Sequence, residues 1–261
     1  MPIDARPCPA CRKAVGRHAG FCASCGRDLR AGAFTPLATH ASPLVAHSTE
    51  PASAYSAELS RVGWLFGLLL ASSLILGWTS RDAPGPWPGT VVTAIDALVI
   101  FMFAVWRYRE MRLLLQVRMP EVDRVFEVAM IAAGLVLAMS AYFTVLQHMG
   151  VPMTKAGAVF LRTGWPSWAM YLQVSVMPAI FEELAFRGVI QQSLGTIFRE
   201  RDASLIQAAL FSAMHLSPIV FPSHFLMGLC FGYLRMRTKS LYPGMLLHGT
   251  WNALMLWQEL R

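Results

Sequence analysis

Two adjacent carboxylates and an arginine stand inside an apolar segment, residues 175–190, which reads SVMPAIFEELAFRGVI. Glu183 and Arg187 are four positions apart, so on a helix they share one face and can form an ion pair. Glu182 is rotated by about 100° from Glu183 in a helix of 3.6 residues per turn. Its carboxylate is therefore free to face a different partner. A buried glutamate of this kind can act as a general base toward a water molecule.

Two later segments carry further ionisable or polar groups between apolar residues. His215 stands in ALFSAMHLSP, and His248 and Asn252 stand four positions apart in LLHGTWNAL. A second histidine and an amide can donate hydrogen bonds to a developing oxyanion. The alternative is structural, because a Glu–Arg pair can join helices and a histidine can be a satisfied packing residue. Since all three segments fall on consecutive predicted helices, we favour one shared polar cavity.

The elements that must position these residues are membrane helices. The chain has 261 residues, of which 55% are hydrophobic and 14% charged, and its mean hydropathy is +0.47. Soluble domains have about 45–50% apolar and about 25% charged residues. The composition predicts an all-α, polytopic transmembrane bundle with about seven segments. The expected segments are 62–78, 89–106, 126–147, 168–186, 203–219, 222–236 and 241–257.

The net charge of +7 is read as a topology signal rather than as a nucleic-acid surface. No interleaving of aromatic and basic residues is present, so no nucleic-acid partner is expected. Residues 107–125 hold five arginines, which places this loop in the cytoplasm by the positive-inside rule. The N-terminus is then cytoplasmic as well, and we expect a multi-pass protein of a bacterial plasma membrane that contacts lipid.

The N-terminal segment contains Cys8, Cys11, Cys22 and Cys25, arranged as two Cys-x2-Cys knuckles ten residues apart. Four thiolates suit a tetrahedral structural zinc, which supplies folding energy to a segment too short for a core. A redox pair and thiols without a ligand role are the alternatives. The predicted organisation is a zinc ribbon at 1–32, a flexible linker rich in Ala, Ser, Pro and Thr at 33–60, and a transmembrane domain at 61–258 with its motif core at 165–257.

The three motifs resemble those of the CPBP intramembrane proteases, the CAAX-processing and bacteriocin-processing group also called the Abi family. The resemblance rests on E-E-x-x-x-R at 182–187, F-x-x-x-H at 211–215 and H-x-x-x-N at 248–252, with the glycine-bearing stretch FLMGLCFG between them. It implies an all-helical membrane fold with the active site inside the bilayer. The small zinc ribbon and the linker lie outside this resemblance.

The resemblance also implies roles for single residues. Glu182 with His215 would activate water, Glu183 and Arg187 would hold the helix and tune the site, and His248 and Asn252 would stabilise the tetrahedral oxyanion. The family is filed as metalloprotease, although a metal-free glutamate mechanism is also argued for it. Glu182, His215 and His248 could ligate a zinc with one open position, in which case Glu183 has to serve as base. Both mechanisms stay open at this point.

The sequence therefore predicts an intramembrane endopeptidase that cuts membrane-associated peptides or protein tails with glutamate- and histidine-activated water. One alternative is a non-catalytic immunity or scaffold protein of the same family. Another, less favoured, is a proton-coupled transporter, for which no inverted repeat is visible. The ribbon could dock a cytoplasmic partner. The absence of H-E-x-x-H, G-x-S-x-G and G-x-G-D disfavours zincin-like, serine and aspartyl enzymes.

Overall fold

A computed structural model describes residues 5–9, 12, 14–16, 52–79, 85–116, 122–152 and 156–260. The chain divides into two compact units, Met1–Thr49 and Glu50–Arg261. In the first unit, β1 (Ala5–Pro7) pairs antiparallel with β2 (Ala14–Gly16), with Ala5 opposite Gly16. Cys8 follows β1 and is buried. Cys11, Cys22 and Cys25 lie outside the described residues, so the zinc ribbon stays a prediction.

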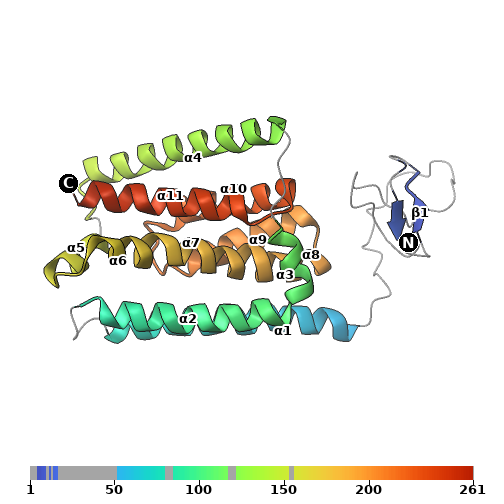
Figure 1. Cartoon of the computed structure of the whole chain (residues 1–261), viewed down its shortest axis with the longest axis horizontal. Coiled ribbons are helices and arrows are strands. Elements are labelled where there is room, and N and C mark those ends of the chain that lie inside the picture. The colour runs from blue at the N-terminus through green and yellow to red at the C-terminus, as the bar shows by residue number, and fades with distance from the viewer. Residues whose placement is uncertain are drawn as a thin grey trace. The chain divides into compact units, whose positions relative to one another are not determined.

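The second unit is helical throughout its described ranges, and its long helices run roughly alongside one another (Figure 1). The helices that precede the motif region are α1 (Ala52–Thr79), α2 (Trp87–Trp106), α3 (Tyr108–Leu114), α4 (Val122–His148) and α5 (Ala156–Arg162). The motif region comprises α6 (Ser167–Tyr171), η1 (Leu172–Val176), α7 (Met177–Glu182), η2 (Glu183–Ile190), α8 (Gln191–Ile197), α9 (Glu200–Ala213), α10 (Phe221–Thr238) and α11 (Tyr242–Glu259). The segments η1 and η2 are π-helical.

Three helices are long and apolar enough to cross a membrane, judged by length and composition. They are Tyr55–Thr79, Trp87–Trp106 and Asp123–His148, and they make the protein a multi-pass membrane protein. They contain the first three predicted segments. Within the described ranges, the helices of the other four predicted segments do not meet this criterion.

Two predicted boundaries are wrong. The segment predicted at 203–219 ends as a helix at Ala213, because Leu216 takes a left-handed backbone with φ 52° and Ser217 precedes a proline. The linker predicted at 33–60 also extends too far, since α1 begins at Ala52. Residues 52–60 read ASAYSAELS and continue directly into the apolar helix, so the helix includes polar residues that composition alone assigned to the linker.

Prolines mark the starts of three helices. Pro88, Pro222 and Pro243 lie in the first turns of α2, α10 and α11, where a missing N–H costs no helical hydrogen bond. At the other end of α10, Lys239 adopts a left-handed conformation with φ 53° and its N–H returns to Arg235 O. The prolines and Lys239 thus determine where α10 and α11 begin and where α10 ends, which keeps the connections between α9, α10 and α11 short.

The core is centred on η2, in which every residue is buried. Phe186, Val189 and Ile190 have almost no exposed surface and pack in one cluster with Phe211 of α9 and Phe231 of α10. The helices α1, α2, α9 and α10 all contact η2. The segment that carries the two glutamates is therefore the most enclosed part of the helical unit.

Arg107 joins the first helices to the motif region. It lies between α2 and α3 with only 7% of its surface exposed, and its guanidinium bonds Glu58 of α1 at 2.7 Å and Ser193 of α8 at 2.8 Å. This arginine was counted as a loop charge in the topology argument. In the fold it is a buried brace between α1 and the helical run that holds Glu182 and Glu183.

Candidate active site

The site is built on one long helical run from Ser167 to Ile197, interrupted by the two π-helical segments. Glu182 is the last residue of α7, and Glu183 is the first residue of η2. A π-helical turn widens the helix and changes the direction in which side chains leave it, and such turns are frequent at functional sites. The two adjacent glutamates thus stand at the junction between an α-helical and a π-helical turn.

Glu183 links an arginine to a histidine. Its Oε1 accepts a hydrogen bond from Arg187 NH1 at 2.8 Å and lies 3.2 Å from His248 Nδ1 on α11. The pairing of Glu183 with Arg187, predicted from their spacing, is confirmed. All three residues are at least 96% enclosed, so their charges interact with little solvent screening. A carboxylate at Nδ1 fixes the orientation of the imidazole ring.

Glu182 faces the other nitrogen of the same ring. Its Oε2 lies 3.8 Å from His248 Nε2 and has no hydrogen-bond partner, although this oxygen is buried. The Glu182 side chain as a whole is 29% exposed, whereas that of Glu183 is 1% exposed. His248 therefore stands between an enclosed carboxylate that holds it and the carboxylate of a more exposed side chain.

Gly244 makes room for this arrangement. A Cβ atom at this position of α11 would lie 2.6 Å from Glu183 Oε2, closer than side-chain atoms normally approach. The second oxygen of Glu183 has no hydrogen-bond partner and is covered by the α11 backbone at this glycine. Helix α11 thus approaches η2 closely enough for His248 to reach Glu183.

Two aromatic rings enclose the arginine. The Arg187 guanidinium lies 4.3 Å from the ring centroid of Phe211 and 5.2 Å from that of Phe231. Cation–π contacts of this kind compensate in part for the removal of the charge from water. The Phe211 ring also contacts His248, with 6.0 Å between ring centroids. Phe211 is therefore the shared wall of the arginine and histidine sites.

His215 contacts the same phenylalanine, Phe211. It follows α9, its Nδ1 lies 2.9 Å from Phe211 O, and its ring centroid lies 5.2 Å from that of Phe211. In the described part of the chain, no hydrogen bond or ion pair joins His215 directly to Glu182. The structure brings His215 and His248 to one phenylalanine, and Glu182 lies beside His248.

His224 lies near the start of a predicted segment and belongs to none of the three motifs. Its ring lies 3.9 Å from that of His215 and 5.9 Å from that of Phe211, measured between centroids. The loop between α9 and α10 turns back sharply and brings the two histidines together although they are nine positions apart. The only signal in the sequence was Ser217-Pro218, which indicates a turn between them.

Asn252 lies one helical turn beyond His248, and one of its amide hydrogens is already engaged. Its Nδ2 donates to Val174 O in η1 at 3.2 Å. In an α-helix this carbonyl would accept the N–H of residue 178, which is a proline and has none. Asn252 therefore replaces a backbone donor that Pro178 removes and ties α11 to the glutamate-bearing run. This bond leaves its role toward an oxyanion a prediction.

Comparison with protein families gives one match, which covers residues 163–254 and is described as type II CAAX prenyl endopeptidase Rce1-like. These residues are similar to a domain of that peptidase family. Comparison with curated proteins and with solved structures finds no match for this chain. The matched range contains all seven residues that the three motifs name, and it excludes the N-terminal unit and the three apolar helices.

Glu182, His215 and His248 are the residues predicted as possible ligands of a catalytic metal. Among the described residues, no three His, Cys, Asp or Glu side chains are placed where they could share one ion. In particular, Glu182, His215 and His248 do not form such a group. Ligation of a catalytic zinc by these three residues therefore stays a prediction.

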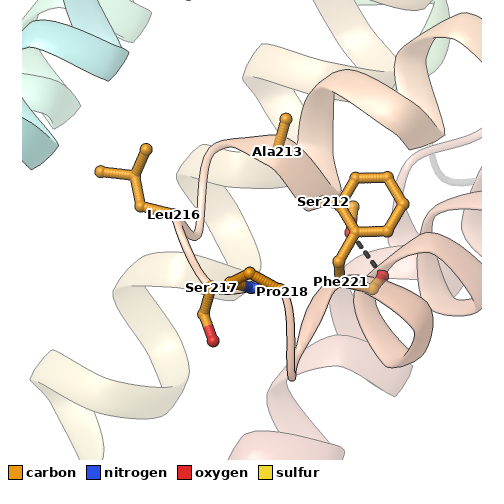
Figure 2. Close-up of a pocket in the computed structure, with 6 residues that line it drawn as sticks. All are labelled: Ser212, Ala213, Leu216, Ser217, Pro218 and Phe221. Carbon is orange, nitrogen blue, oxygen red and sulfur yellow. Dashed lines mark hydrogen bonds between the residues drawn. The ribbon is translucent and has the colours of Figure 1, made fainter.

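An open depression of about 450 Å³ lies beside His215 in the matched range. Figure 2 shows the residues that line it, which come from the end of α9, the loop and the start of α10. Its lining is mostly apolar and includes Leu216, Pro218 and Phe221. Ser212 donates a hydrogen bond to Phe221 O and so closes the base of the loop (Figure 2).

Proposed function

We propose that this protein is an intramembrane endopeptidase that hydrolyses peptide bonds in membrane-associated peptides or protein tails. The observation that carries the proposal is His248, held at Nδ1 by Glu183 and facing the carboxylate of the more exposed Glu182 at Nε2. It occurs inside a range similar to a domain of a peptidase family and in a chain with three apolar helices. The description of the family as prenyl endopeptidases makes a lipid-bearing C-terminal peptide the first substrate class to test.

In the proposed reaction, Glu182 with His215 activates the water. Glu182 accepts a proton from this water, and the resulting hydroxide adds to the peptide carbonyl carbon. The oxyanion accepts hydrogen bonds from His248 Nε2–H, in the protonated form of the ring, and from the Asn252 amide. The carbon–nitrogen bond then breaks, and Glu182 returns its proton to the leaving amine. Glu183 and Arg187 act as positioning residues, because they hold His248 rather than touch the peptide.

The apolar depression beside His215 supports a membrane-associated substrate. A peptide held there would place apolar side chains against Leu216, Pro218 and Phe221, and its backbone near the histidines. Burying apolar groups of the substrate provides binding energy that positions the scissile bond. A freely soluble, highly charged peptide would gain little from this surface.

Purified full-length protein in detergent micelles provides the test. It is incubated with matched C-terminal peptides, with and without a thioether-linked isoprenoid, and new peptide termini are identified by mass spectrometry. We expect cleavage by the wild type and loss of about 10²- to 10⁴-fold in rate with Glu182→Gln, the magnitude typical for removal of a general base. Asp123→Asn is the control, since Asp123 is exposed at the start of α4.

Undiminished cleavage by the folded Glu182→Gln protein would contradict the assignment of this residue. No cleavage of any tested peptide by the wild type, together with retained function of Glu182→Gln in cells that need the protein, would favour a non-catalytic immunity or scaffold protein. The two candidate functions thus predict opposite outcomes for one variant.

We further propose that residues 1–32 form a zinc ribbon on the cytoplasmic side of a bacterial plasma membrane, where it could dock a partner. Four cysteines in two pairs support this proposal, and Cys8 is buried beside the β1–β2 hairpin. Metal analysis of the purified full-length protein should find one zinc per chain, reduced by Cys22→Ser but unchanged by Cys230→Ser, which is in α10. Zinc that persists after the first substitution would contradict the ligand set.

A further inference from the structure

A second, smaller pocket of about 90 Å³ lies where α8, α9 and α10 meet, outside the candidate active site. It is lined by polar groups of all three helices, among them Gln191, Glu200 and Arg235. Neither the three motifs nor the proposed reaction uses this pocket. Its size suits one small polar group rather than an apolar chain.

Arg235 is a buried cation without a matching anion. Only 8% of its surface is exposed, its NH2 donates to Gln192 Oε1, and its Nε has no hydrogen-bond partner. Among the described residues, no carboxylate lies at ion-pair distance from it, and Glu200, which lines the same pocket, interacts with its charge only over a longer distance. An enclosed charge is costly unless it is paired. The missing partner of Arg235 is therefore expected to come from outside the chain.

Gln191 offers an unpaired acceptor in the same pocket. It is 1% exposed, and its Nε2 donates to Gly232 O at 3.2 Å, which leaves its Oε1 with no partner. A buried amide oxygen without a donor carries a desolvation cost. A ligand that satisfies both residues is anionic at one atom and carries a hydrogen-bond donor, such as an O–H, at another.

The first turn of α9 adds a positive electrostatic contribution. Glu200 and Ala203 line the pocket, so it adjoins the end of a helix whose leading N–H groups have no helical acceptor. Phosphate groups bind at such helix N-termini. The first turn also carries the carboxylates of Glu200 and Asp202. Glu200 is 63% exposed and pairs with Lys239 Nζ at 3.1 Å, which offsets part of the negative charge at the pocket.

We propose that this pocket binds the phosphate group of an anion, supplied either by a lipid headgroup or by free phosphate. The guanidinium and the α9 terminus match the phosphate oxygens. Gln191 Oε1 accepts an O–H, which hydrogen phosphate and a glycerol headgroup both have and a carboxylate lacks. Arg199 and Arg201 add basic residues beside the pocket, whereas Arg237 pairs with Glu127 and Lys239 with Glu200. Basic residues are expected on a surface that meets anionic headgroups.

Three variants of the full-length protein distinguish binding in the pocket from a general effect of surface charge. Arg235→Gln removes the buried cation. Gly195→Leu fills a lining position at which a Cβ atom meets nothing within 4 Å, so the fold is expected to tolerate it while the pocket is blocked. Arg201→Gln is the matched control, because it removes one positive charge from an exposed position of α9 that does not line the pocket.

Melting temperature is measured in a zwitterionic detergent while inorganic phosphate, or phosphatidylglycerol added to the micelles, is titrated at constant ionic strength. We expect a saturable rise with at least one probe, an apparent Kd at least tenfold weaker in Gly195→Leu and Arg235→Gln, and less than a twofold change in Arg201→Gln. A rise with phosphate alone identifies the free anion as the source, and a rise with the lipid alone identifies a headgroup.

The proposal is overturned if neither probe gives a saturable rise with the wild type. It is equally overturned if Gly195→Leu keeps the wild-type affinity, or if Arg201→Gln loses as much as Arg235→Gln. Should Arg235→Gln fail to fold, Gly195→Leu decides the result. Because the measurement is binding rather than cleavage, its outcome is independent of the proposed peptidase activity.

Discussion

The apolar helices α1, α2 and α4 differ from the enclosed segment η2 in the side chains that they expose and enclose. The three apolar helices leave most of their side chains exposed, with Leu98 and Leu137 at 60% and 72%. Segment η2 instead encloses Glu183 and Arg187, at 1% and 0% exposure. Lipid accepts apolar side chains at no cost, so the outer helices need little protein contact. Ionisable groups need partners, and the enclosed helices supply them.

This contrast predicts which substitutions matter. Changes to the buried polar groups should have large effects, because each group depends on a specific partner. Changes to exposed apolar groups of the outer helices should have small effects, because acyl chains replace what is lost. The variants below test the contrast, beginning with the greatest expected effect.

Arg187→Met should have the greatest effect on stability. It leaves the carboxylate of Glu183 enclosed without a cation, and removal of one partner of a buried pair costs about 3–5 kcal/mol. The melting temperature of the purified protein measures this loss. The double variant Glu183→Gln, Arg187→Met should recover part of it, since no unpaired charge remains. Equal stability of Arg187→Met and wild type would contradict the contrast.

Gly244→Ala should affect activity more than stability. The new methyl group lies 2.6 Å from Glu183 Oε2, so the carboxylate must rotate and withdraw Oε1 from His248. Displacement of a positioned catalytic group by about 1 Å can cost about 10²-fold in rate. Peptide cleavage and melting temperature are measured together. The control is Gly195→Ala, whose Cβ meets nothing within 4 Å; if both variants cleave at the wild-type rate, Gly244 does not position Glu183.

Gly228→Ala should destabilise the contact between α9 and α10. Its Cβ would lie 2.8 Å from the Cα and Cβ atoms of Ala208, and backbone cannot move aside as a flexible side chain does. Overpacking of this kind costs about 1–3 kcal/mol. Gly67→Ala in α1 meets nothing within 4 Å and should be neutral or stabilising. A melting temperature for Gly228→Ala at or above that of Gly67→Ala would refute the close approach.

Leu137→Ala should have the smallest effect. Leu137 of α4 is 72% exposed, so its removal is expected to change the free energy of unfolding by no more than about 0.5 kcal/mol in micelles. Leu184 of η2 is only 8% exposed, and Leu184→Ala should cost about 2–5 kcal/mol. Similar losses for the two leucines would show that α4 is packed against protein rather than lipid.

The sequence predicted the outer helices well because hydropathy alone identifies a lipid-facing helix. It also predicted the Glu183–Arg187 pair, since helical spacing determines which side chains can meet. The contact of Glu183 with His248 could not be derived, because it depends on how closely α11 approaches η2 at Gly244. The π-helical turns depend on tertiary packing and leave no pattern in composition.

The placement of His224 shows a different limit. Its position near the start of an expected segment gave no sign of a contact with His215, which the sharp loop at Leu216 brings about. Loop geometry decides which helix ends meet, and a single sequence does not specify it. The neighbourhood of Phe211, with three histidine rings around it, became apparent only in three dimensions.

Cleavage in water enriched with ¹⁸O tests the central claim, that Glu182 beside the Glu183-held His248 activates water, most directly. The wild type and Asp123→Asn should each place one ¹⁸O atom in the new C-terminal carboxylate of the product. Glu182→Gln, whose folding is checked by its melting temperature, should yield labelled product about 10²- to 10⁴-fold more slowly. Product formed by Glu182→Gln at the wild-type rate, or product from the wild type without the label, would contradict the claim.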